Sequence, residues 1–166
     1  MRILKNIGRL ILKCLKILGT FVGGCIVLIL TYFLLFIPIG NELILKGYTE
    51  ELENYDLGIN YEIIASDDQC GKLSGNGNGM QYLSAELIYT EDEPKLENED
   101  WYGTDLWTLD EALEEDGLLS VYYYGPYCPN IKNAADQLTS HDGYYIMYSF
   151  HDAEWGSIWN DDLRAH

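Results

Sequence analysis

Two cysteines that lie far apart in the chain carry the most reactive side chains of its acidic part. A disulfide between Cys70 and Cys128 would form in an oxidising compartment and would stabilise a small domain by roughly 4 kcal/mol, because it restricts the unfolded chain. Two free thiols are the first alternative. The second is a nucleophilic Cys128 with His141 or His151 as the base that makes its thiolate. Because no catalytic-cysteine signature surrounds Cys128, the sequence favours the disulfide.

Two His-Asp pairs supply side chains of the kinds that bind zinc. His141-Asp142 comes before a predicted strand, and His151-Asp152 comes after it. An extended strand of that length would hold the pairs about 33 Å apart, so they cannot share an ion unless the chain bends sharply. We therefore interpret them as surface residues and predict neither a metal site nor a cofactor.

A run of alternating glycine and asparagine at 75–79 has the flexibility of a phosphate-binding loop. It lacks the lysine and the hydroxyl residue that follow in such loops, and a strand rather than a helix is predicted after it. Asn-Gly pairs between two strands are typical of hairpin turns, so a turn is predicted here. The acidic runs, such as 97–100 and 114–116, are interpreted as solvated surface, and no pair of carboxylates is singled out as catalytic.

Tyrosines cluster on two predicted strands, and two tryptophans follow them in the sequence. Because side chains alternate along a strand, some of these rings are expected in the core and the others on a surface. Exposed tyrosine and tryptophan are typical of interfaces, and beside acidic residues they suit a cationic peptide or protein. The predicted binding residues are Tyr122, Tyr124, Tyr145, Trp155 and Trp159.

The charge of the chain is divided between its two ends. The formal net charge is −17, yet the first forty residues hold five basic side chains and no acidic one. From Asn41 onward, five basic residues stand against 27 acidic ones, a net charge of −22. A domain with this charge repels the phosphates of nucleic acid, so nucleic-acid binding is not expected.

An uncharged apolar segment at 17–39 determines where the rest of the chain lies. As a helix, its 23 residues would cover roughly 34 Å, which exceeds a hydrocarbon core of about 30 Å. The segment predicts a single membrane-spanning helix that ends near Pro38. Positive charge stays on the cytoplasmic side, so residue 41 onward is predicted outside the plasma membrane. A cleaved signal peptide, a lipoprotein modified at Cys25 and a buried helix of a soluble protein are the alternatives.

The chain is predicted to have four regions. They are a basic amphipathic cytoplasmic stub at 1–16, the membrane-spanning helix at 17–39, an acidic juxtamembrane helix or linker at 40–58, and an acidic extracytoplasmic domain at 59–166. The last region carries nearly all of the features described above.

The pattern of the outer domain predicts strands at 59–65, 80–90, 118–124 and 143–150. The sequence from Thr108 to Glu111 fits a capping box at the start of a helix that ends at Gly117. A second short helix is predicted over 130–138. This order predicts an α+β fold, with a small antiparallel or mixed sheet and helices packed on one face of it.

Three functional classes are compatible with these features. The favoured class is a binding or interaction domain of unknown ligand, anchored in the bilayer through 17–39 and directed at a cationic peptide or protein. An envelope enzyme that uses Cys128, His141 or His151 is one alternative. The other is an accessory subunit of a membrane complex, with the glycines of the span at 19, 23 and 24 as its contact surface.

Overall fold

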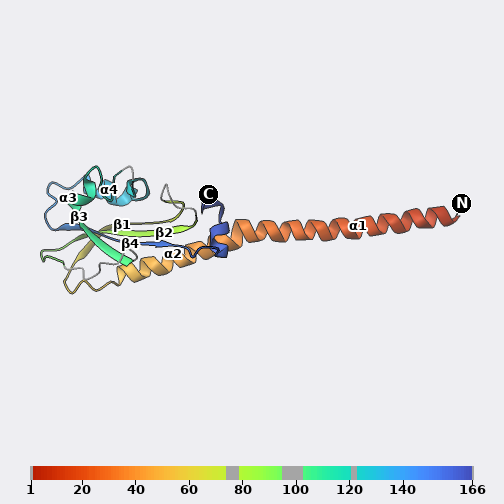
Figure 1. Ribbon diagram of the computed structural model, residues 1–166, viewed down its shortest axis with the longest axis horizontal. Coiled ribbons are helices and arrows are strands. Elements are labelled where there is room, and N and C mark those ends of the chain that lie inside the picture. The colour runs from red at the N-terminus through yellow and green to blue at the C-terminus, as the bar shows by residue number, and fades with distance from the viewer. Residues whose placement is uncertain (1, 74–78, 95–102, 121–122, 166) are drawn as a thin grey trace.

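One long helix forms the first third of the chain. The computed structural model describes residues 2–73, 79–94, 103–120 and 123–165. Helix α1 (Arg2–Thr31), a π-helical turn η1 (Tyr32–Phe36) and helix α2 (Ile37–Glu53) follow one another without a break. Helix α1 extends alone from the folded part of the chain, whereas α2 lies against it (Figure 1). The segment 40–58, predicted as an acidic juxtamembrane helix or linker, is helical as far as Glu53, and this helical part packs against the sheet.

The helix continues through Pro38, contrary to the expectation that it ends there. In the π turn just before it, the N–H of Ile37 donates to the carbonyl of Tyr32, five residues earlier. Proline has no N–H to donate, and its ring crowds the carbonyl of the preceding helical turn. A wider turn at this point accommodates that disturbance and keeps the chain helical.

Helix α1 exposes the apolar side chains that it carries between Ile11 and Leu30, with Phe21 and Leu28 among the most exposed. Within the described part of the chain, the continuous helix Ile11–Glu53, to which α1 belongs, is the one helix that is long and apolar enough to cross a membrane. The glycines at 19, 23 and 24 face open space, because a Cβ atom added to any of them would meet no other described part of the chain within 4 Å.

A four-stranded antiparallel sheet forms the centre of the domain. Its strands are β1 (Glu62–Gly71), β2 (Gln81–Tyr89), β3 (Gly103–Thr108) and β4 (Tyr144–Asp152), in the spatial order β1-β2-β4-β3. Every neighbouring pair is antiparallel. The α+β class is thus confirmed, and the sheet is antiparallel rather than mixed.

Helices cover both faces of this sheet, so the prediction that they pack on one face is wrong. Helices α3 (Leu109–Leu113) and α4 (Pro129–Ala135) lie on one face, and α2 lies on the other (Figure 1). The cause is the unbroken helix, which carries buried Leu45 and Leu52 onto the sheet. We call these the α4 face and the α2 face.

The two faces are packed differently. The α4 face carries one large apolar core, which includes Leu83, Leu87 and Ile146 from the sheet. The α2 face has two smaller apolar clusters, one around Leu45 and Tyr82 and another around Leu52, Ile88 and Met147. Polar side chains such as Ser84 and Ser149 are buried on the same face. This gap in the apolar packing is where the candidate site lies.

The third strand lies earlier in the chain than predicted. Strand β3 occupies 103–108, whereas the predicted strand at 118–124 is not formed: residues 118–120 and 123–124 lie in turns, and 121 and 122 are outside the described residues. Leu118 and Leu119 are buried, which explains the apolar run there. The chain turns tightly here, because the N–H of Gly125 donates to the carbonyl of Ser120. A Cβ atom added to Gly125 would lie only 2.1 Å from the carbonyl oxygen of Leu119.

Candidate functional site

The structure contains no disulfide between Cys70 and Cys128, because each is a free, buried cysteine. They lie on opposite faces of the sheet. Cys70 packs in the cluster of Leu45 on the α2 face, and Cys128 packs in the core of the α4 face. The sheet separates the two thiols, so closing the predicted disulfide would require the fold to open.

The groups proposed for an enzyme are also kept apart. Cys128 is fully buried, and burial, with a smaller contribution from Asp67, raises the pKa of its thiol to about 12, which keeps it protonated. A ring nitrogen of His141 lies 2.7 Å from a carboxylate oxygen of Asp110. His151 lies at the other end of β4, where its Nε2 is 2.7 Å from the hydroxyl of Ser149. Each histidine is thus engaged with another side chain, and His151 also stacks on Tyr48 of α2, on the face opposite that of Cys128.

The predicted aromatic binding residues do not form one surface. Tyr122 lies outside the described residues. Tyr124 packs against Phe150 at a ring distance of 5.1 Å on the α4 face, and Tyr145 packs beside the Leu52 cluster on the α2 face. Trp155 is 97% exposed, and Trp159 stacks on Phe36 of the long helix. The chain thus spreads these rings over two faces and one end of the sheet.

A buried polar network joins the helix to the end of the chain. Asn41 is fully buried and donates to the carboxylate of Asp162 at 2.9 Å, while the hydroxyl of Tyr82 donates to Asn41 at 2.6 Å. Arg164 binds the same Asp162 carboxylate at 2.9 Å and also pairs with Glu42. Burial alone would raise the pKa of Asp162, but the hydrogen bonds from Arg164 and Asn41 outweigh burial and lower it. The network is internally satisfied and therefore structural.

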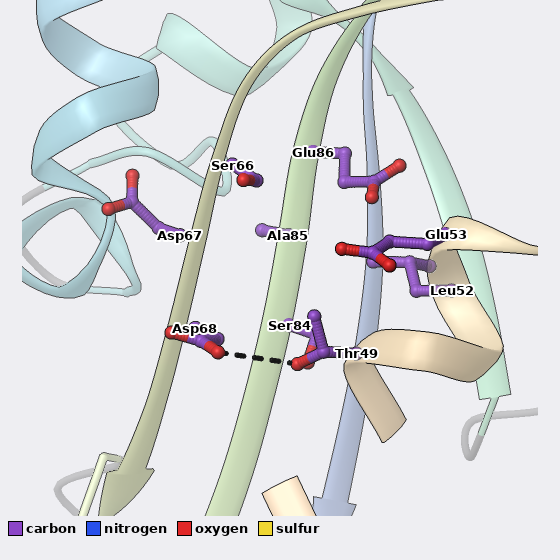
Figure 2. A pocket seen from close by; sticks show the side chains of 9 residues that line it. All are labelled: Thr49, Leu52, Glu53, Ser66, Asp67, Asp68, Ser84, Ala85 and Glu86. Carbon is purple, nitrogen blue, oxygen red and sulfur yellow. Dashed lines mark hydrogen bonds between the residues drawn. The ribbon is translucent and has the colours of Figure 1, made fainter. Parts of the chain in front are cut away.

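A cleft opens on the α2 face, between the last turns of α2 and strands β1 and β2 (Figure 2). Its volume is about 150 Å³, which is room for roughly five water molecules at about 30 Å³ each. None of the nine residues that line it is basic: they are Thr49, Leu52, Glu53, Ser66, Asp67, Asp68, Ser84, Ala85 and Glu86.

Glu86 is the residue that distinguishes this cleft. Its side chain is on the α2 face of the central strand β2, and the residue is 2% exposed. Neither carboxylate oxygen has a hydrogen-bond partner among the described residues. Burial, with a smaller contribution from Glu53, raises the pKa of Glu86 from 4.5 to about 7. A buried carboxylate without partners is costly, because it loses water and gains nothing in return.

The other polar groups of the cleft lie close to Glu86. Figure 2 shows the carboxylates of Glu53 and Glu86 pointing toward one another across the cleft, and Asp68 bound to Thr49 at its lower edge. The Thr49 hydroxyl is also 2.8 Å from that of Ser84. Asp67 points the other way, where its carboxylate accepts from the N–H of Ile131 at 2.8 Å. Glu53, Asp68 and Glu86 therefore give the cleft its negative potential.

The arrangement fits an organic cation better than a metal ion. Among the described residues, no group of three or more histidine, cysteine, aspartate or glutamate side chains is placed to hold a metal. The carboxylates at the cleft come from separate elements, α2, β1 and β2, with the Thr49 and Ser84 hydroxyls nearby. An ammonium or guanidinium group has several donors and can satisfy such a spread of oxygens.

The sequence did not single out Glu86, because its position in the strand predicts a solvent-exposed side chain. In an alternating strand, a glutamate between Ala85 and Leu87 is expected on the open face of a sheet. The signal that could have found it was the amphipathic helix before β1: once that helix is placed on the sheet, every polar residue of the covered face needs a partner.

The comparisons give no functional analogy. The chain matches no known protein-family model, and neither a curated protein nor a solved structure is significantly similar to it.

Proposed function

We propose that this chain is a membrane-anchored binding domain whose cleft receives a cationic side chain from a peptide or protein. The observation that carries the proposal is Glu86, a buried carboxylate with no partner among the described residues, at the base of a negatively charged cleft. A lysine or arginine head group would supply the missing hydrogen bonds and the opposite charge. Such a ligand would turn a destabilising group into a satisfied one.

The anchor of this domain is the long helix, with its basic N-terminal part in the cytoplasm and the sheet domain outside the plasma membrane. Ile37 is fully buried in the folded domain, so the length open to lipid is better taken as 17–36, about 30 Å of helix. Retention of the helix is favoured over cleavage as a signal peptide. Cleavage near residue 40 would remove Ile37 and expose the network around Asn41.

The size and charge of the cleft limit what it can receive. Room for roughly five waters suits one head group and part of its aliphatic stem, and not a folded element of a partner. The rest of the outer domain, which is strongly acidic, would attract a basic partner from a distance and raise its association rate at low salt. Specific capture would then depend on the cleft.

Binding of a fluorescent hexalysine peptide tests this function. The full chain in phosphatidylcholine nanodiscs would be titrated and followed by anisotropy, with fully acetylated hexalysine as the uncharged control peptide. We expect Glu86→Gln to weaken binding by at least about tenfold, because a buried charge pair is lost. The matched control is Glu115→Gln, which makes the same substitution in an exposed turn after α3, and we expect it to change the affinity less than about twofold.

Two results would contradict the proposal. Equal weakening by Glu86→Gln and Glu115→Gln would mean that the peptide responds to net charge and not to the cleft. Equal binding of acetylated and unacetylated hexalysine would mean that charge is irrelevant. If the cleft is the site, binding must also release a proton near neutral pH, since the pKa of Glu86 is about 7 and the bound form is ionised.

A further inference from the structure

We infer that the C-terminal segment 155–163 forms a collar that docks on the headgroup region of the bilayer crossed by the helix. The inference rests on the proposed insertion of that helix and is independent of the cleft. Its partner is a lipid surface. Three observations carry it: where the collar lies, how it is fastened, and which of its side chains are left uncovered.

The collar lies where the long helix leaves the folded domain. It includes the short 3-10 helix η3 (Ile158–Asp161), which Figure 1 shows against the long helix near the start of α2. The ring of Trp159 stacks on Phe36 at a centroid distance of 6.2 Å. The same ring lies across Gly40, where an added Cβ would be only 2.2 Å from its Cζ3 atom.

Several hydrogen bonds hold the collar in place. Asn160 accepts from the N–H of Met80 at 2.7 Å and donates to the carbonyl of Glu154 at 2.9 Å. Asn41 donates to the carbonyl of Trp159 at 3.2 Å and to the buried Asp162 carboxylate at 2.9 Å. The collar is therefore a built part of the end of the domain nearest to α1.

Large apolar side chains of the collar nevertheless have little protein around them. Trp155 is 97% exposed, Leu163 is 64% exposed and Ile158 is 46% exposed. The neighbouring helix adds Phe36 and Ile39, which are 55% and 57% exposed, and the ring of Phe36 is in contact with Trp159 of the collar. Apolar area of this kind is unfavourable in water. It is normal at the boundary of a membrane, where tryptophan in particular gathers.

The charges of the collar indicate which lipid it prefers. Asp161 is exposed within the collar, and Glu154 is exposed immediately before it. Anionic headgroups would repel both carboxylates, whereas zwitterionic headgroups would not. We therefore expect the collar to dock on phosphatidylcholine and to be displaced, with the helix still inserted, as phosphatidylglycerol is added.

Fluorine spectroscopy can place the collar relative to the membrane. The full chain would be made with 5-fluorotryptophan and reconstituted in phosphatidylcholine nanodiscs, and its four tryptophan signals would be assigned by Trp→Phe variants. Trp155→Phe is safe for this purpose because the side chain is almost fully exposed. Trp107 is the internal control, since it lies on β3 opposite Ile146, toward the other end of the sheet.

The collar predicts two opposite effects at Trp155. A nitroxide on the lipid headgroup should broaden its signal severalfold more than that of Trp107, and a water-soluble gadolinium chelate should broaden it less. Both differences should shrink when phosphatidylglycerol replaces part of the phosphatidylcholine.

The contrary outcomes are separable. If gadolinium broadens Trp155 strongly and the lipid nitroxide does not, the collar does not dock. If neither agent broadens it, the segment is covered by protein, such as a second copy of the chain, and the lipid proposal is overturned. Labelling of Cys25 by a water-soluble maleimide in a Cys14→Ser background reports on the anchor itself. Labelling of Cys25 would contradict insertion of the helix and therefore also docking of the collar. If Cys25 is protected but gadolinium broadens the Trp155 signal strongly, only docking of the collar is contradicted.

Discussion

Two carboxylates are buried close to helix α2, and their surroundings are opposite. Asp162 is 1% exposed and accepts hydrogen bonds from Asn41 and Arg164, which lower its pKa. Glu86 is 2% exposed and has no hydrogen-bond partner among the described residues, and burial raises its pKa to about 7. Both residues are almost without solvent exposure, but only Asp162 has hydrogen-bond donors at its carboxylate, among the described residues, and these outweigh the effect of burial on its pKa.

The difference separates structure from candidate function. Asp162 ties the C-terminal segment to the long helix, and the fold alone accounts for its charge. Glu86 receives no hydrogen bond from the described residues, so its charge costs stability unless a ligand supplies the missing partner. Removing each carboxylate, or the group that sets its surroundings, and measuring the free energy of unfolding tests whether the two differ in this way.

Loss of Asp162 should have the largest effect. In Asp162→Ala, Arg164 loses its buried partner and the amide of Asn41 loses an acceptor, so we expect a loss of about 4 kcal/mol in the free energy of unfolding. Guanidinium unfolding of the full chain in detergent, followed by near-ultraviolet circular dichroism, measures it. A loss below about 1 kcal/mol would place the pair among weak surface ion pairs.

Replacement of Glu86 should have the opposite sign. Glu86→Met keeps the length of the side chain and removes the unpaired charge, so we expect it to stabilise the domain by up to about 3 kcal/mol at pH 8. The same variant should lose capture of hexalysine. A domain that becomes less stable when Glu86 is replaced would show that its carboxylate has a structural partner, and the comparison with Asp162 would fail.

The pH dependence of this gain follows from the raised pKa. Between pH 4.5 and about 7 the folded state holds the proton of Glu86 more tightly than the unfolded state does. The wild-type protein therefore loses stability as pH rises through that window, by about 3 kcal/mol from this group. The difference between Glu86→Met and the wild type should grow over the same window and then level off. A constant difference would contradict the assigned pKa.

A smaller loss in the free energy of unfolding is expected when Gly40 is replaced. Gly40 leaves room for the ring of Trp159, next to the network that includes Asp162. In Gly40→Ala the new methyl group would meet the ring of Trp159, which must move away from the helix and disturb the contact of Asn41 with the Trp159 carbonyl. Overpacking of this kind costs about 1–2 kcal/mol. Gly47→Ala is the matched control, because its added Cβ meets nothing within 4 Å and should be neutral or slightly stabilising. If the two substitutions had equal effects, the position of Trp159 would not matter for the stability of the network.

The sequence predicted those elements whose formation depends on residues close together in the chain. The capping box at Thr108 is present, with the Thr108 hydroxyl accepting from the N–H of Glu111 and the glutamate reaching back. Strands β2 and β4 lie within two residues of their predicted ranges. Such features depend on neighbours in the chain, so one sequence contains the information.

The candidate site depends on contacts between distant segments, and the sequence did not reveal it. Glu86 becomes buried only because the helix continues through Pro38 and turns its Leu52 side toward the sheet. Asn41 and Asp162, separated by 121 residues, meet for the same reason. Alternation along β2 gives a polar residue at 86 whether the face is open or covered. Only the placement of the helix distinguishes a solvated glutamate from a buried one.

The smallest effect is expected at Glu53, and it tests whether the cleft acts as one electrostatic unit. The negative charge of Glu53 contributes to the raised pKa of Glu86, so Glu53→Gln should lower that pKa from about 7 toward 4.5 without reaching it, because burial is the larger cause. Carbon-13 chemical shifts of the Glu86 carboxyl, titrated from pH 4 to 9, measure the change, and Glu115→Gln should leave the titration in place. Since Glu53 is itself exposed, the free energy of unfolding should change by only a few tenths of a kcal/mol. An unchanged titration of Glu86 would mean that the two carboxylates do not share the cleft, and a cationic ligand would then have to bind Glu86 alone.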